Sequence, residues 1–211
     1  QTQQQQQQQK MVHSIKVEPL TIDSFKPYGD VVQLEGNKNI VIANQGTAKR
    51  VNHIAKLENL RLASGPALQS ARPNMCIFSS APRPTSSGRF EVKLLERHPY
   101  SSQVFMPIHQ DGVKNADPNA PCYLVIVANN GPDDKPDLKT IRAFAANSTQ
   151  GINYKANSWH SPMVTIGERV NFLVLVWENG VALQDCEEAP ISPVQIDLTP
   201  SFKNLNGNPK L

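Results

Sequence analysis

The sequence predicts an all-β domain whose strands form an antiparallel sandwich or barrel with a few short helices. Short apolar runs rich in β-branched residues, such as 122–128 and 170–177, have the length and composition of buried strands. The 17 prolines are scattered along the 211 residues, which leaves little room for long helices. Segments rich in turn-forming residues separate the apolar runs, at 80–88, 110–121, 129–137 and 147–151.

Along the chain, the expected elements begin after a glutamine-rich leader. Residues 1–13 are of low complexity and are expected to be disordered, so that residues 14–211 form a single domain. A short helix is expected within 20–29, where Thr21 can act as the N-cap. Segment 34–75 is harder to type, and either leads into the barrel or contributes to a dimer contact. The strands expected beyond it lie at 90–95, 122–128, 140–146, 162–167 and 170–177.

Composition argues against several classes of protein. The 21 basic and 18 acidic residues nearly balance, and no basic stripe with interleaved aromatic residues appears, so no nucleic-acid partner is expected. No apolar run approaches the roughly 20 residues that span a bilayer, and the first residues lack the apolar core of a secretory signal, so no membrane partner is expected. Cys76, Cys122 and Cys186 form no CxxC pair. They favour neither a disulfide framework nor a cysteine zinc site, and a cytoplasmic location is the simplest.

The stretch LLERHPYSSQVFMP, residues 94–107, combines polar side chains with a strand pattern. Apolar residues alternate into it, at Phe90, Val92 and Leu94. Continued alternation places Glu96 and His98 on the same buried face, and Arg97 on the opposite face, towards solvent or a partner subunit. Buried charged and polar groups need partners, so an inward Glu and His indicate either a functional site or a satisfied core ion pair. A bulge near Pro99 would shift this alternation.

The spacing Glu96-x-His98-x4-Gln103 resembles the first metal-binding motif of cupins, usually written His-x-His followed by Glu. The stretch QGINYKANSWHSP, which carries His160, resembles the second. Nitrogen and oxygen donors from two strand regions can hold a divalent metal with positions open for a substrate. The resemblance implies a cupin-like double-stranded β-helix, or jelly-roll barrel. Glu and Gln in place of the usual ligands leave open a site that works without a metal.

Longer stretches resemble the ureidoglycolate lyase family, with a fungal-type signature in ANQGTA. The resemblance is carried by LLERHPYSSQVFMP, CYLVIVAN, DKPDLKTIRAFAANSTQGINYKANSWHSPM and KPYGDVV, and it extends from about residue 15 to 195. Each motif alone is weak, whereas the ordered set is highly specific. Two departures are visible. Many bacterial members read WHHP where this chain has WHSP at 159–162, and members often carry an arginine where this chain has FSS at 78–80.

The resemblance implies that residues 14–211 form a homodimeric, cupin-like catalytic domain. The implied enzyme is a carbon–nitrogen lyase of the amidine-lyase type, which cleaves ureidoglycolate to glyoxylate and urea in allantoin and purine degradation. In this elimination at the carbinol carbon, a base takes the hydroxyl proton while the C–N bond breaks, and an acid protonates the departing urea nitrogen. No organic cofactor is implied, which agrees with the lack of GxGxxG, GxxxxGK or GxSxG motifs in a suitable setting.

Two versions of the chemistry share one set of catalytic candidates, His98, His160 and Glu96. In the first, the histidines act as acid and base and Glu96 orients an imidazole. In the second, Glu96, His98, Gln103 and His160 hold a divalent ion, nickel, manganese or zinc, and a bound water or Glu96 moves the proton. The substrate-binding candidates are Arg50, Lys135, Arg97, Gln103 and Tyr154, of which the three cations are candidates for binding the carboxylate.

Other interpretations stay open at this point. Arg97 can be a solvated or subunit-bridging cation, Lys135 a turn lysine, and Arg50 part of a polar cluster that closes the barrel mouth or caps a short helix. A ureidoglycolate hydrolase would use the same substrate but release ammonia and carbon dioxide. A non-catalytic cupin that binds a small carboxylate, and a metal-dependent sugar isomerase, are the alternatives from other functional classes.

Overall fold

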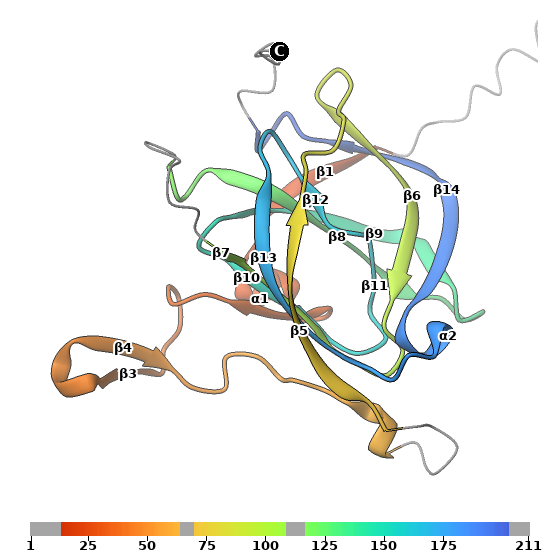
Figure 1. Cartoon of the computed structure of the whole chain (residues 1–211). Coiled ribbons are helices and arrows are strands. Elements are labelled where there is room, and N and C mark those ends of the chain that lie inside the picture. The colour runs from red at the N-terminus through yellow and green to blue at the C-terminus, as the bar shows by residue number, and fades with distance from the viewer. Residues whose placement is uncertain (1–13, 64–69, 109–116, 203–211) are drawn as a thin grey trace, which may run out of the picture.

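The computed structural model describes residues 14–63, 70–108 and 117–202, and the expected leader at 1–13 lies outside them. Strands dominate the described residues, which confirms the all-β, cupin-like class (Figure 1). The larger sheet has seven strands, in the order β11 (Trp159–His160), β6 (Arg89–Arg97), β14 (Glu187–Asp197), β1 (Ser14–Pro19), β9 (Pro136–Asn147), β8 (Pro121–Asn130) and β12 (Val164–Thr165). Because β11 also pairs with β8, this sheet closes on itself as a barrel.

A second sheet covers one side of the barrel. It has five strands, in the order β2 (Gly29–Val32), β10 (Gly151–Tyr154), β7 (Gln103–Ile108), β13 (Val170–Glu178) and β5 (Arg72–Ser80). The helical elements are short: α1 (Ile22–Phe25), α2 (Ala182–Asp185) and the 3-10 turns η1 (Asn44–Gly46) and η2 (Leu60–Ala63). The expected helix is confirmed as α1, in which the Thr21 side chain caps the Ser24 N–H at 3.1 Å. No helix of the described residues has the length and apolar character to cross a membrane.

Two hydrophobic cores share the strand β8. The first core fills the closed seven-stranded sheet and includes Ile126 and Trp159. The second lies between the two sheets and includes Val127 of the larger sheet and Phe172 of the smaller. Since successive side chains of a strand point to opposite faces, Ile126 and Val127 face different cores. Strand β8 therefore has no solvent-facing side over its buried middle, which explains the continuous apolar run at 122–128.

Four of the five expected strands lie within β6, β8, β9 and β13, whereas strands such as β1, β2, β5, β10 and β14 were not individually expected. The strand expected over 162–167 shortens to the two residues of β12. The sheets were expected to be antiparallel, but β1 runs parallel to both of its neighbours, β14 and β9. Ser14 lies opposite Gln195, and Val17 lies opposite Ala143, so both pairings join residues that are distant in sequence.

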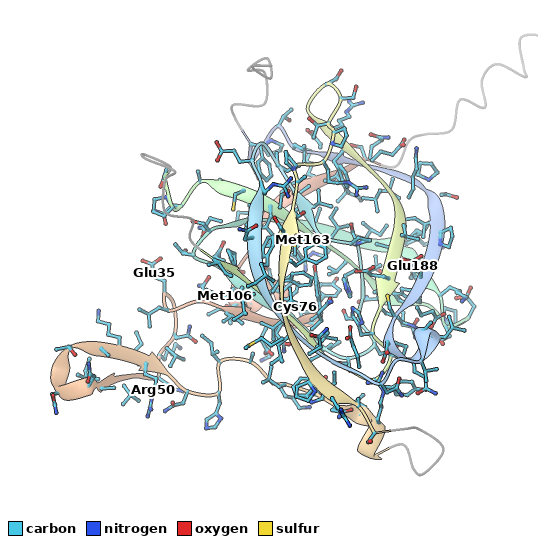
Figure 2. All side chains as sticks on the ribbon, in the orientation of Figure 1. Glu35, Arg50, Cys76, Met106, Met163 and Glu188 are labelled. Carbon is cyan, nitrogen blue, oxygen red and sulfur yellow. The ribbon has the colours of Figure 1, made fainter. Side chains whose placement is uncertain are left out.

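Segment 34–75 contains a two-stranded arm that projects from the body (Figure 1). The arm consists of β3 (Ile40–Ala43) and β4 (Ala48–Val51), paired antiparallel. Beyond it the chain passes through η2 and reaches β5, an edge strand of the five-stranded sheet. Figure 2 shows Arg50 on the arm, away from the barrel.

The predicted alternation along β6 is wrong in its phase. Phe90, Val92 and Leu95 are buried in the first core, whereas Leu94 is only partly buried. The register between β6 and β14 shifts between Pro190 and Val194, and this irregularity changes the phase before Leu95. Glu96 therefore lies on the face opposite Phe90 and Val92.

Glu96 still points into the molecule, because the opposite face of β6 borders the second core. His160 pairs with both Glu96 and Val127, and side chains directly opposite one another on paired strands share a face. Val127 belongs to the second core, so Glu96 and His160 point towards the space between the two sheets. Glu96 thus points into the molecule, as predicted, but towards the second core and not towards the face of Phe90 and Val92.

Candidate active site

His160 lies at the seam where the barrel closes. Its strand, β11, is only two residues long and hydrogen-bonds to β6 on one side and β8 on the other. The residue is 1% exposed, and its Nδ1 lies 2.8 Å from the Ser158 carbonyl oxygen. Because a carbonyl can only accept, Nδ1 carries the hydrogen and Nε2 keeps its lone pair. Nε2 is buried and has no hydrogen-bond partner among the described residues.

His98 repeats this arrangement from the end of β6. Its Nδ1 lies 2.6 Å from the backbone oxygen of Asp185, the last residue of α2, so Nδ1 donates and Nε2 again keeps its lone pair. The Nε2 atom is buried and unpartnered within the described part of the chain. The centroids of the His98 and His160 rings are 5.6 Å apart. Two neutral imidazoles thus present free acceptor nitrogens to one small region.

Glu96 completes the group. Its Oε1 lies 3.6 Å from His160 Nε2, and only 18% of its side chain is exposed. One donor atom from each of Glu96, His98 and His160 lies within 4.8 Å of the other two, so these residues could hold a metal ion. The donors are of the nitrogen and oxygen types that suit divalent transition metals. Backbone carbonyls hold both Nδ1–H groups, as is usual for imidazoles that bind metal through Nε2.

Burial sets the protonation states of the group. It raises the pKa of Glu96 to about 7, and the carboxylate of Glu188, which lies opposite Glu96 on the paired strand β14, adds to the increase. It lowers the pKa of His160 to about 3, with a smaller contribution from His98, whose own pKa burial also lowers. Both imidazoles are therefore neutral at neutral pH, and the carboxyl group is the one that changes charge near pH 7. The Cys186 sulfur, 4.0 Å from Glu96 Oε2, stays a thiol because burial raises its pKa to about 12.

Tyr154 and Gln103 line the same region. The Tyr154 ring stacks on the His160 ring, with centroids 3.9 Å apart and planes 13° from parallel. Gln103 lies opposite Tyr154 on the neighbouring strand β7, so the two side chains share a face. Its side chain interacts with His98 and acts to raise the His98 pKa against the lowering caused by burial. Its buried Oε1 has no hydrogen-bond partner in the described residues.

Arg97 was expected to face outward, and this expectation is wrong. It lies on the first-core side of β6, where its guanidinium stacks 4.4 Å above the Trp159 ring. The same guanidinium binds Asp134 at 2.7 Å and Glu187 at 2.6 Å. Its side chain is 6% exposed, because these partners and the Trp159 ring enclose it.

Five of the predicted site residues come together and three do not. Glu96, His98, Gln103, Tyr154 and His160 meet between the two sheets. Arg97 faces the other core, Lys135 forms an ion pair with Glu187 at 3.2 Å, and Arg50 is on the arm.

Sequence reasoning missed four contributors to the site. Two are backbone oxygens, those of Ser158 and Asp185, which leave no signature in residue type. Glu188, labelled in Figure 2, was missed because it becomes a neighbour of Glu96 only through the β6–β14 pairing. Cys186 comes to Glu96 in the same way, from the residue just before β14.

The fold and this interior group define a cupin-like barrel with a polar site suited to binding a metal or a small molecule. The chain matches the family model described as ureidoglycolate lyase over residues 12–197. It is 34% identical to the ureidoglycolate lyase of Schizosaccharomyces pombe over 86% of this chain and 94% of that protein. Identity to the ureidoglycolate lyase of Burkholderia mallei is 36%, over 77% of this chain and 81% of the relative. For the Saccharomyces cerevisiae ureidoglycolate lyase it is 32%, over 79% and 87%. The chain belongs to the ureidoglycolate lyase family.

Proposed function

We propose that this protein is a lyase that cleaves ureidoglycolate to glyoxylate and urea, as a step of allantoin and purine degradation. Family membership and the names of the three relatives support the substrate. The observation that carries the site is the convergence of two buried, unpartnered imidazole nitrogens on one carboxyl group. Buried polar atoms without partners are rare in proteins, and a ligand that binds them explains why they are retained.

Glu96 carries the proton in this proposal. The reaction moves one proton from the hydroxyl oxygen of the carbinol to the ureido nitrogen, while the C–N electron pair leaves with that nitrogen and a C=O bond forms. A carboxyl group with a pKa of about 7 is present in both protonation states at neutral pH, which suits a group that takes and returns a proton. The lowered pKa values of His98 and His160 favour Glu96 over either imidazole in this role.

The other site residues bind and orient the substrate. The Nε2 lone pairs of His98 and His160 and the Oε1 of Gln103 accept hydrogen bonds from its hydroxyl and ureido groups. The Tyr154 ring fixes the His160 imidazole by stacking on it. The three cations predicted to bind the carboxylate, Arg97, Lys135 and Arg50, lie outside this group of residues, and Arg97 faces the other core. Arg97 and Lys135 would have to exchange their contacts with Glu187, whereas Arg50 would reach a site only from a partner subunit.

The same donors fit a divalent metal ion, with nickel, manganese and zinc as the candidates. Glu96, His98 and His160 would hold it, and Gln103 would be the fourth protein ligand. When bound, such an ion supplies Lewis-acid chemistry that lowers the pKa of the substrate hydroxyl. The buried Nε2 atoms and the carbonyl-held Nδ1–H groups support this version. No organic cofactor is proposed.

Product analysis tests the reaction. Purified protein, free of urease, should convert ureidoglycolate to equal amounts of urea and glyoxylate. Release of ammonia and carbon dioxide would identify a hydrolase and reject the lyase proposal. Glu96→Gln should lower kcat/KM by about 100-fold or more, the scale of general acid–base catalysis, and His160→Ala should lower it by removing a substrate-binding acceptor. Glu91→Gln is the matched control, because Glu91 lies on the same strand but is exposed. Near-normal activity of both site variants would refute the proposed site.

We further propose that the protein is a homodimer. The edge strand β5 exposes Met75 and Ile77, which are 69% and 59% accessible, and the arm exposes Ile42 at 61%. Large exposed apolar side chains on an edge strand and on a projecting hairpin are typical of interfaces. Sedimentation should give a dimer, and Ile42→Lys or Met75→Lys should shift it towards the monomer. A monomeric wild-type protein would reject this proposal.

Two simpler proposals complete this assignment. Residues 14–211 are proposed to form one catalytic domain, because both cores use β8 and β9 and cannot form without each other. A cytoplasmic location is proposed because the three cysteines are unpaired, as is usual in a reducing compartment. A single cooperative unfolding transition and the fluorescence of a tagged full-length chain in cells would test these two proposals.

A further inference from the structure

Arg61 is a buried arginine outside the group of side chains described above. It lies in η2 and is 1% exposed. Its Nη1 donates to the Trp177 carbonyl at 3.1 Å, and its Nη2 donates to the Gln184 carbonyl at 2.7 Å and to Asp185 Oδ1 at 2.6 Å. Burying a guanidinium is costly unless its partners are well placed, so this residue holds something in position.

The carboxylate that Arg61 binds is also the centre of a tight turn. Asp185 Oδ1 accepts the Asn179 backbone N–H at 2.9 Å, and Oδ2 accepts that of Gly180 at 2.7 Å. These contacts tie the carboxyl end of β13 to α2, since Asp185 is the last residue of that helix. The backbone oxygen of Asp185 in turn accepts the Nδ1–H of His98 at 2.6 Å. One residue thus links Arg61 to the imidazole.

We propose that Arg61 is a positioning residue that sets the tautomer and ring orientation of His98. By fixing Asp185 through its side chain, Arg61 fixes the carbonyl that holds the hydrogen on Nδ1. The lone pair of Nε2 is then aimed at the region shared with Glu96 and His160. This proposal rests on the proposed function only in that a lone pair on Nε2 serves the site.

His160 provides an internal reference. Its Nδ1–H is held by the Ser158 carbonyl, which belongs to a turn closed by a hydrogen bond from Ser158 N to Lys155 O at 3.2 Å. The contacts of the Arg61 guanidinium go to β13, to the α2 turn and to the Tyr100 ring, and do not include this turn. A change at Arg61 should therefore alter His98 and leave His160 unchanged.

Nitrogen-15 NMR of the histidine side chains reads the tautomers directly. In metal-free protein without substrate, His98 and His160 should both show the neutral form with hydrogen on Nδ1. In Arg61→Met, the His98 signals should move to the Nε2–H form or to a mixture of the two, while those of His160 stay in place. Arg142→Met is the matched control, because Arg142 forms an ion pair with Glu18 at 2.7 Å outside the site. It should alter neither histidine.

Two further variants keep the test decisive. If Arg61→Met does not fold, Asp185→Asn replaces it, since this change keeps the backbone oxygen and removes the charge that Arg61 holds. Arg61→Lys keeps a charge but cannot make all three contacts, so it should restore the His98 tautomer only in part. An unchanged His98 tautomer in a folded Arg61→Met or Asp185→Asn protein would overturn the proposal.

Activity gives a second readout that separates this proposal from the proposed function. Arg61→Met should lower kcat/KM by about 10- to 100-fold, the usual effect of removing a group that orients a ligand or catalytic imidazole. If wild-type protein does not split ureidoglycolate, the proposed function fails, yet the NMR comparison still decides the role of Arg61. If Arg61→Met shows wild-type activity with an altered tautomer, the positioning is real and the use of Nε2 in the lyase reaction is rejected.

Discussion

Replacement of Glu96 by glutamine should raise the free energy of unfolding of the metal-free protein above that of wild type, and this gain should be larger at alkaline pH than at acid pH. Burial raises the pKa of Glu96 from 4.5 to about 7, so the folded protein binds its proton more tightly than the unfolded chain does. Wild-type stability therefore falls as pH rises from about 4.5 to about 7, and the loss is complete above that window. The difference between the two pKa values corresponds to about 3 kcal/mol. Glutamine has a similar shape and no charge, so Glu96→Gln escapes this loss.

Urea denaturation at pH 5 and pH 8 measures the effect. Part of the loss is already present at pH 5, so the stability gain of Glu96→Gln over wild type should grow by about 2.5 kcal/mol between the two pH values. Taking each gain relative to wild type at the same pH cancels the titration of every other group. Glu91→Gln makes the same chemical change at an exposed position of β6 and should give a much smaller difference. A gain for Glu96→Gln that is equal at both pH values would refute the raised pKa.

Three further outcomes are expected. Tyr154→Leu should lower kcat/KM by about ten-fold or more because it removes the ring stacked on His160, whereas Tyr154→Phe should keep most activity; equal losses would refute a role for stacking. Gly29→Ala should destabilise the fold by more than about 2 kcal/mol in urea denaturation, because φ is +154° and a Cβ would collide with the Asn153 backbone oxygen; an unchanged midpoint would contradict this. A sample shown by elemental analysis to be metal-free should keep its activity, because proton transfer by Glu96 needs a carboxyl group that binds no metal; loss of activity on chelation would reject this role and support the metal version.

Some strands were predictable from sequence because their burial shapes the local residue pattern. The run at 122–128 is apolar because the middle of β8 is buried on both faces, whereas β13 alternates between buried residues such as Phe172 and more exposed ones such as Leu173. The choice of pairing partner has no such local signature. The parallel strand β1 lies between β14 and β9, and nothing within 14–19 specifies partners more than 100 residues away. The phase change in β6 was equally hidden, because the irregularity that causes it includes residues of β14.

The site was predictable where the chemistry belongs to side chains. Glu96, His98 and His160 stand out because ionisable residues in strand patterns need an explanation. What holds them was not predictable, since the acceptors for both imidazoles are backbone oxygens, which every residue carries. Arg97 was misplaced for a related reason. Its partners, Asp134 and Glu187, lie in a hairpin and in the last strand, and only the folded sheet brings them together.

Closure of the barrel and the chemistry of the site depend on the same contacts. β11 closes the sheet through His160, and this closure removes water from Glu96 and both imidazoles. In water the carboxyl group would be ionised and the imidazoles would titrate near neutral pH, so no carboxylic acid would be available to protonate a leaving nitrogen. Burial moves the pKa of Glu96 upward and those of the histidines downward, which leaves one proton carrier among neutral acceptors. The stability that Glu96 costs the fold is therefore the same free energy that brings its pKa to the value a proton-transfer group needs at pH 7.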